Sequence, residues 1–162
     1  MVYFITEYLQ TDNKAAELTL FIRLIYLYLK PGSYIKTDKH MGISTVTDQN
    51  WHIVRYSAEE KECWDRFVRR SKNGTFLLQR DYMGYHAERF QDCSLLIYCN
   101  QKLTALLPGN LSGDCFYSHQ GLTYGGILLS ASITLAQAES AFCTALNYLH
   151  TECGVQSLVY RA

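Results

Sequence analysis

The sequence predicts an α/β protein of the α+β type, with a mixed, largely antiparallel sheet and flanking helices. Three observations support this prediction. Short apolar runs separated by turns fill the second half of the chain, which is typical of antiparallel strands. Two segments carry apolar residues at helical spacing behind a capping box. A strand-like segment, Ser157–Tyr160, follows the later of these two helices. Strands that alternate with helices indicate a sheet covered by helices.

The composition fits one domain with a sizeable core. The chain has 162 residues, 48% of them hydrophobic, and its 15 basic side chains balance 15 acidic ones. A typical domain has roughly 150 residues. Because binding to a phosphate backbone normally requires an excess of Lys and Arg, the neutral balance argues against nucleic acid as a partner.

Charge is distributed unevenly along the chain. The segment 93–162 holds only five charged side chains, which are Lys102, Asp114, Glu139, Glu152 and Arg161. An average globular sequence has about 25% charged residues. A segment so poor in charge cannot solvate much surface, so we expect it to be the buried centre of the fold or one half of a larger unit.

Residues 1–50 are predicted to be a helical appendage and a linker. The apolar run Leu18–Leu29 is 12 residues long and is followed by Pro31 and Gly32. A membrane-spanning helix needs about 20 apolar residues, so a buried helix or an interaction surface is favoured over a transmembrane segment. Docking on a membrane surface is the weakest interpretation. The polar stretch 33–50 is typical of a linker, which leaves 51–162 as the domain proper.

A short strand and two helices are expected at the start of that domain. The strand is His52–Tyr56, and Ser57 with Glu60 forms a capping box for the helix that follows. Asn73-Gly74 is a left-handed stop for this helix. The segment Asp81–Phe90 has aromatic and charged residues at helical spacing and is the second helix.

Antiparallel strands and one long helix are expected next. Four apolar runs alternate with turns, at Ser94–Cys99, Leu103–Leu107, Cys115–Ser118 and Ile127–Leu129. The long helix begins at the capping box of Thr134 and Gln137 and ends at Gly154. Ser157–Tyr160 is the last strand. Because a bare strand edge is an aggregation hazard, we expect a second lobe or a second copy of the chain to cover it.

The six cysteines are predicted to be reduced and mostly buried. They form no C-x-x-C pair and no short Cys/His cluster of the zinc type, so no metal site is expected. Cys93 and Cys99 flank an extended run and would lie about 20 Å apart at about 3.3 Å per residue, too far for a disulfide. Reduced thiols indicate a cytoplasmic location. The first residues also lack the basic region of a secretory signal.

The densest group of polar and aromatic side chains is the loop 116–126. His119 is the candidate base or substrate-orienting residue, and Tyr117 and Tyr124 are candidate hydrogen-bond donors. Glycine lets a backbone approach a ligand closely. The candidate binding residues of this loop are Ser118, Gln120, Gly125 and Gly126. The alternative interpretation is a tight connection whose glycines serve left-handed turns and whose tyrosines lie half in the core.

A second candidate cluster lies around the segment Asp81–Phe90. Arg80 and His86, with Tyr82 and Arg89 nearby, carry charge and hydrogen-bonding groups that suit an anionic substrate. The alternative interpretation is a solvated rim over packed aromatic residues.

Spaced motifs from the first helix to the glycine-rich loop carry a family resemblance. They are Trp64-x-x-Phe67-Val68-x-x-Ser71 continuing to Arg89-Phe90, then Ala105-Leu-Leu-Pro108, then Tyr117-Ser-His-Gln-Gly-Leu-Thr-Tyr-Gly-Gly126. Together they resemble the N-terminal half of a bacterial acyltransferase family that is GNAT-like and related to the FemAB type, whose members transfer acyl or aminoacyl groups to amines. The likeness covers about residues 51–160.

The resemblance implies an acyltransferase that uses acyl-CoA, such as acetyl-CoA, and a small-molecule or saccharide-type amine acceptor. It also implies a GNAT-like fold of which this chain is a truncated N-terminal lobe. The Arg/Gln-x-x-Gly-x-Gly/Ala loop with which such domains hold the CoA pyrophosphate at a helix N-terminus is not found in the sequence. The alternative is a non-catalytic binding or assembly module that pairs with a second lobe or protomer.

Overall fold

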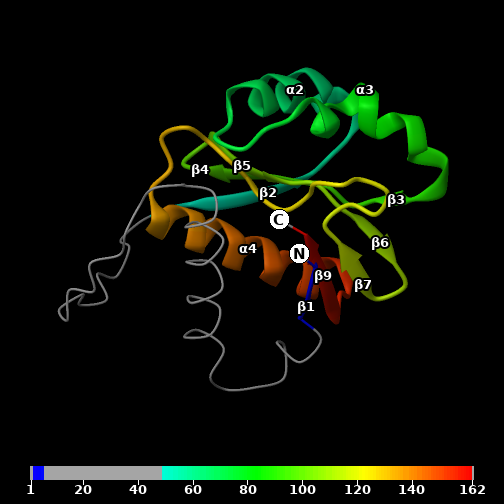
Figure 1. Cartoon of the computed structure of the whole chain (residues 1–162). Coiled ribbons are helices and arrows are strands. Elements are labelled where there is room, and N and C mark those ends of the chain that lie inside the picture. The colour runs from blue at the N-terminus through cyan, green and yellow to red at the C-terminus, as the bar shows by residue number, and fades with distance from the viewer. Residues whose placement is uncertain (1, 6–48, 162) are drawn as a thin grey trace.

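Two β-sheets and three α-helices form the part of the chain that the computed structural model describes, residues 2–5 and 49–161 (Figure 1). This arrangement confirms the predicted α+β class. The first sheet has the order β1 (Val2–Ile5), β9 (Ser157–Arg161), β7 (Cys115–Tyr117), β6 (Asn110–Ser112) and β3 (Gln91–Asp92). The second has the order β2 (Trp51–Arg55), β4 (Leu95–Cys99), β5 (Lys102–Leu107) and β8 (Leu128–Leu129). Among these described strands, only β7 and β9 pair in parallel.

Helical layers cover both faces of the second sheet. One layer is α4 (Leu135–Cys153), and the other contains α2 (Lys61–Arg70) and α3 (Arg80–Met83), as Figure 1 shows. Because neighbouring side chains of a strand point to opposite faces, Leu95 and Ile97 pack toward α4, whereas Leu96 packs toward α2 and α3. All three side chains are fully buried. This burial on two sides explains why the segment after residue 93 carries so few charges.

The long helix α4 begins and ends as predicted. The hydroxyl of Thr134 accepts a hydrogen bond from the backbone of Gln137 at 3.3 Å, and the Gln137 side chain accepts one from the Thr134 backbone at 3.1 Å. Gly154 closes the helix in the left-handed conformation, with φ of 68°. The sequence signals are reliable here because both ends of the helix depend on local hydrogen bonds alone.

Three other local predictions were wrong. Ser57 makes no side-chain capping bond within the described chain and instead begins the 3-10 turn η1 (Ala58–Glu60) through its carbonyl. Gly74 does not end α2, which stops at Arg70. The expected helix Asp81–Phe90 is the single turn α3 followed by the 3-10 helix η3 (Gly84–Arg89), after the 3-10 turn η2 (Phe76–Leu78). Gly84 favours this break because glycine lowers helix propensity.

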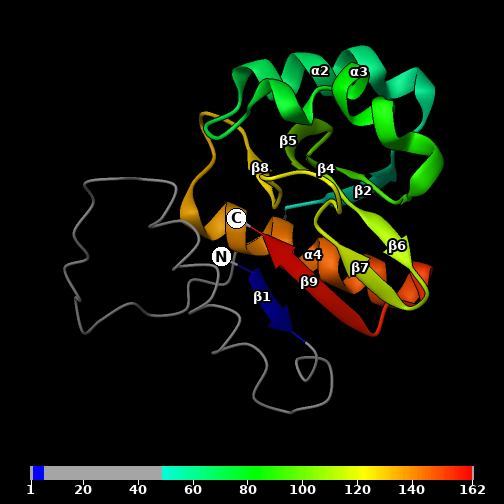
Figure 2. The same cartoon turned by 45° about the vertical axis from the view of Figure 1, so that its right-hand side comes forward.

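The last strand, β9, has a neighbour from its own chain on each side. It pairs with β7 in parallel and with β1 in antiparallel register, from Val2 opposite Arg161 to Ile5 opposite Leu158 (Figure 2). The neighbour that we expected from a second lobe or second copy is therefore supplied by residues 2–5. Most of the expected appendage, including the run Leu18–Leu29, lies outside the described residues. No helix in the described ranges is long and apolar enough to cross a membrane.

Gly109 gives a test of how tightly the core is packed. A methyl group at Gly109 would lie 2.0 Å from Cζ of Phe116, which is fully buried. We expect Gly109→Ala to lower the free energy of unfolding by about 1–3 kcal/mol, because added volume strains a filled core. Urea unfolding followed by circular dichroism measures this change.

The matched control is Gly84→Ala. Gly84 has an ordinary helical φ of −63°, and a methyl group there would meet no described atom within 4 Å. This variant should stay within about 0.5 kcal/mol of the wild type. Equal losses in the two variants would contradict the packing around Gly109.

Candidate functional site

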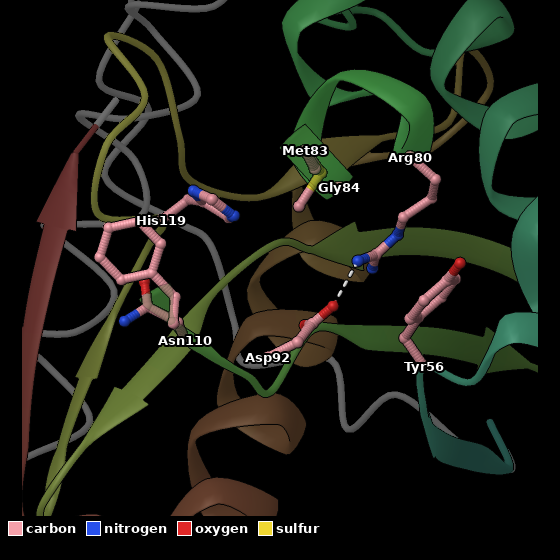
Figure 3. A pocket seen from close by; sticks show the side chains of 8 residues that line it. Tyr56, Arg80, Met83, Gly84, Asp92, Asn110 and His119 are labelled. Atoms are coloured by element: carbon pink, nitrogen blue, oxygen red, sulfur yellow. Dashed lines mark hydrogen bonds and ion pairs between the residues drawn. The ribbon is translucent and has the colours of Figure 1, made fainter. Parts of the chain in front are cut away.

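A cavity of about 150 Å³ opens where the two sheets meet, beside α3 and η3 (Figure 3). Its walls come from six different segments, and the residues that line it are Tyr56, Arg80, Met83, Gly84, Phe90, Asp92, Asn110 and His119. The structure thus brings together Arg80 and His119, which the sequence placed in two separate candidate clusters. The two tyrosines expected beside His119 are not among the described lining residues.

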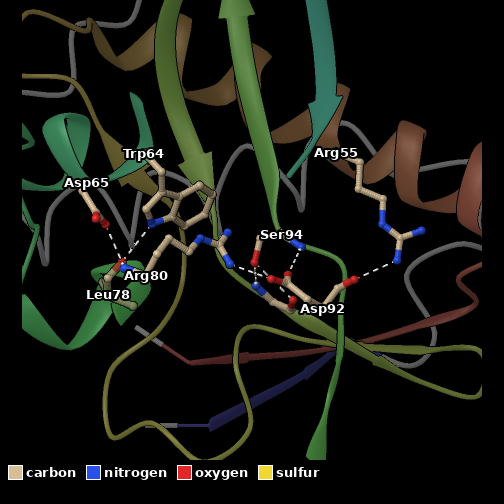
Figure 4. A network of polar contacts seen from close by, with 8 residues as sticks. Arg55, Trp64, Asp65, Leu78, Arg80, Asp92 and Ser94 are labelled. Carbon is tan, nitrogen blue, oxygen red and sulfur yellow. Dashed lines mark hydrogen bonds and ion pairs between the residues drawn. The ribbon is translucent and has the colours of Figure 1, made fainter. Parts of the chain in front are cut away.

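Arg80 is the most unusual residue of the cavity. Its side chain is buried, with 5% of its surface exposed, and its guanidinium lies against two aromatic rings that meet edge to face, the ring of Trp64 (Figure 4) and that of Tyr56 (Figure 3). The guanidinium carbon lies 3.3 Å from the centre of the Tyr56 ring and 3.7 Å from that of Trp64. Such contacts are attractive because the face of an aromatic ring is electron-rich.

Buried hydrogen bonds fix the positions of Arg80 and Trp64. The backbone N–H of Arg80 donates to a carboxylate oxygen of Asp65 at 2.8 Å, and the Trp64 indole N–H donates to the carbonyl of Leu78 at 2.8 Å. These bonds tie the start of α3 and the end of η2 to α2. The backbone of Arg80 is therefore fixed by Asp65, and its guanidinium is held by the two rings and Asp92.

Only one nitrogen of the Arg80 guanidinium has a hydrogen-bond partner in the described chain. Nη1 donates to Asp92, whereas Nε and Nη2 are buried and have none. These two atoms form one edge of the planar group, with N–H bonds that point the same way. Burial lowers the pKa of Arg80 and the charge of Asp92 raises it, but an arginine stays protonated in proteins. The cavity is therefore lined by a positively charged side chain, and two of its nitrogen donors make no hydrogen bond with the described residues.

Asp92 shares its carboxylate between the protein and the cavity. One oxygen accepts from Arg80, and the other accepts from the backbone of Ser94 at 2.7 Å. Arg55 donates to the Asp92 carbonyl, also at 2.7 Å, which fixes the turn before β4. The Asp92 side chain remains 45% exposed. Its orientation is thus set, and part of its surface remains open to a ligand.

His119 lies on the opposite wall of the cavity. Its Nδ1 is 2.8 Å from the carbonyl oxygen of Gln120, and since a carbonyl only accepts, Nδ1 must carry a proton. In the neutral ring Nε2 is then a hydrogen-bond acceptor. His119 has a φ of 68° and packs edge-on against Phe90. Figure 3 shows the imidazole directed across the cavity toward the side where Arg80 and Asp92 lie.

Gln120 anchors the loop rather than lining the cavity. Its side-chain oxygen accepts from Nδ2 of Asn110 at 2.9 Å, and its backbone N–H donates to Oδ1 of Asn110 at 2.8 Å. Asn110 is buried and lines the cavity from β6. This pair of bonds therefore positions both Asn110 and the neighbouring His119.

Ser118, Gly125 and Gly126 make close contacts within the fold, and of the two glycines only Gly126 has the left-handed conformation that the alternative interpretation of this loop expects. The Ser118 hydroxyl accepts from the backbone N–H of Arg161 at 2.7 Å, which ties the loop to β9. A side chain on Gly125 would lie 2.0 Å from the carbonyl oxygen of Ser118. Gly126 has a φ of 77°, and a methyl group there would lie 2.6 Å from the Tyr160 hydroxyl. These glycines are required by close backbone contacts.

The remaining predicted site residues lie elsewhere. Tyr117 is on β7, where a hydrogen bond with Cys115 raises its pKa. Tyr124 is 54% exposed. His86 belongs to η3, but its side chain lies outside the described part of the structure. Sequence reasoning missed Tyr56, Asp92 and Asn110, because nothing local distinguishes them from ordinary strand and turn residues.

The N-termini of the two longer described helices offer no site for the CoA pyrophosphate that the family resemblance implies. Helix α2 has Glu62 in its first turn and Glu59 and Glu60 just before it, which repel an anion. The N-terminus of α4 is closed by its own capping box. Nor do the described ranges contain a group of three or more side chains that would hold a metal ion.

Comparisons with known proteins identify no relative. No protein-family model, no curated protein and no solved structure matches this chain. Function is therefore inferred from the geometry of the cavity.

Replacing Arg80 tests whether this residue stabilises the fold. Arg80→Met removes an ion pair and two ring contacts, but it also removes two buried N–H groups without partners, and methionine packs well against aromatic rings. We expect the free energy of unfolding to change by only about 1 kcal/mol. Urea unfolding measures it, with the exposed Arg66→Met as the control for net charge. A loss above about 3 kcal/mol would show that Arg80 is primarily structural.

Proposed function

We propose that this chain binds a small ligand bearing a carboxylate, or a similarly small anionic group, in the cavity beside Arg80. The observation that carries the proposal is the edge of the guanidinium formed by Nε and Nη2, which is buried without a hydrogen-bond partner among the described residues. Each buried polar group left unpaired costs about 1–3 kcal/mol. A bound carboxylate would recover that cost through two parallel hydrogen bonds.

The size of the cavity supports a small ligand. Pockets for drug-sized molecules measure about 300–1,000 Å³, against about 150 Å³ here. Because solvent does not reach the two unpaired nitrogen atoms, a ligand contacts them only when the side chains around the guanidinium shift on binding.

The walls support a ligand with one polar end and some apolar surface. Tyr56, Met83 and Phe90 offer apolar contacts, while Asn110 and His119 supply polar side chains to the wall opposite Arg80. Small-molecule sites commonly combine apolar walls with a few fixed polar groups of this kind.

Binding of simple anions tests the proposal. We expect acetate to raise the midpoint of thermal unfolding of the wild type in a concentration-dependent way, because a ligand that binds only the folded state stabilises it. Arg80→Met should abolish this shift, and Arg66→Met should retain it. Equal shifts in the wild type and in Arg80→Met would contradict the role of the cavity.

A second candidate function is acyl or aminoacyl transfer to an amine, as the family resemblance implied. The observation that favours it is the position of His119, whose imidazole lines the same cavity and is oriented by the contact of Nδ1 with the carbonyl of Gln120. An imidazole suits a base that takes the proton of an attacking amine. The described residues supply no donor-binding loop, so the proposal concerns the acceptor side only.

Thiol release from acetyl-CoA in the presence of small amines tests this second candidate. We expect His119→Asn to slow acceptor-dependent release by about 100-fold or more, the usual contribution of a positioned base. Asparagine is the suitable replacement because it tolerates the positive φ of residue 119. Release that is independent of the amine, or unchanged in His119→Asn, would exclude His119 as the base.

A further inference from the structure

We infer that the ligand of the Arg80 cavity is a small zwitterion, with a carboxylate and an ammonium group in one molecule, as in a small amino acid. This inference rests on the proposed function and specifies its ligand. It follows from the position of Asp92, which lines the same cavity and contacts the same guanidinium that the ligand carboxylate would approach.

Charge balance within the cavity is the first argument. Arg80 and Asp92 are the charged residues among the described lining side chains, and they already neutralise each other. A simple anion would add a net negative charge next to Asp92 in a partly buried space, so it should bind less tightly than a ligand that also carries a positive charge. A zwitterion leaves the net charge at zero and places each of its charges beside the opposite one.

The hydrogen-bonding capacity of Asp92 is the second argument. A carboxylate accepts about four hydrogen bonds, and the described structure uses two, from Arg80 and from the backbone of Ser94. The side chain is 45% exposed, although its partner Arg80 is buried. An ammonium group in the cavity would use the remaining acceptor positions.

The direct contact between Arg80 and Asp92 is the third argument. Because Nη1 of Arg80 donates to Asp92, the guanidinium and the carboxylate are in direct contact in the cavity wall. A ligand carboxylate beside the guanidinium and a ligand ammonium beside Asp92 would complete a ring of alternating charges. Small amino acids separate these two groups by only one or two carbon atoms, and the cavity volume limits their side chains.

Isothermal titration calorimetry with three matched ligands tests this inference. Glycine carries both charges, glycolate replaces the ammonium with a hydroxyl of similar size, and ethanolamine lacks the carboxylate. We expect glycine to bind the wild type at least about 10-fold more tightly than either of the others, the effect of one charge-assisted hydrogen bond. Equal affinities for glycine and glycolate would overturn the zwitterion and leave the proposed function standing. Absence of binding by all three, and by acetate, would overturn both.

Asp92→Asn tests the same inference from the side of the protein. This variant should lose the preference for glycine over glycolate and still bind glycolate, because Arg80 is unchanged. Asp81→Asn is the matched control, since the carboxylate of Asp81 is 83% exposed, pairs with Lys61 and does not line the cavity as described. The control should keep the wild-type preference. A preference that persists in Asp92→Asn would overturn the inference, and the ligand comparison on the wild type remains decisive if this variant does not fold.

Discussion

Burial of both faces of the second sheet is the constraint on which the rest of the structure depends. Leu96 is covered by the α2 and α3 layer, and its neighbours Leu95 and Ile97 are covered by α4. A sheet that is apolar on two sides cannot exist without a layer on each, because its exposed area would outweigh the gain from strand pairing. The first sheet extends the core on the α4 side through Phe116 and Tyr160. The cavity lies where these layers meet.

Arg80 is the one charged side chain that this arrangement places deep in the described structure without satisfying it. Two rings lie against its guanidinium, and Asp92 accepts a hydrogen bond from one of its nitrogens. A purely structural arginine would be expected to have its donors satisfied, since buried polar groups nearly always are. Exceptions concentrate at functional sites, where local optimisation gives way to ligand binding. The same residue therefore explains the position of the site and the chemistry of its proposed ligand.

Sequence patterns predicted the features that depend on neighbouring residues. The capping box of Thr134, the stop at Gly154 and the apolar strand runs all follow from local hydrogen bonds or from the two-residue period of a strand. The glycines at 125 and 126 allow close approach, as the sequence predicts, and the groups that approach them are Ser118 and Tyr160 of the same chain. Composition cannot distinguish these two causes.

The sequence by itself determined the fold class and the ends of the long helix, and it marked Arg80 and His119 as candidate site residues. Only the tertiary structure decided that these two residues share one cavity, that Asp92 and Asn110 complete it, and that Val2–Ile5 pairs with the last strand. The physical reason is the range of the interactions involved. Helix caps and strand periods are encoded within a few residues, whereas a cavity and a pairing between the chain ends depend on how distant layers pack.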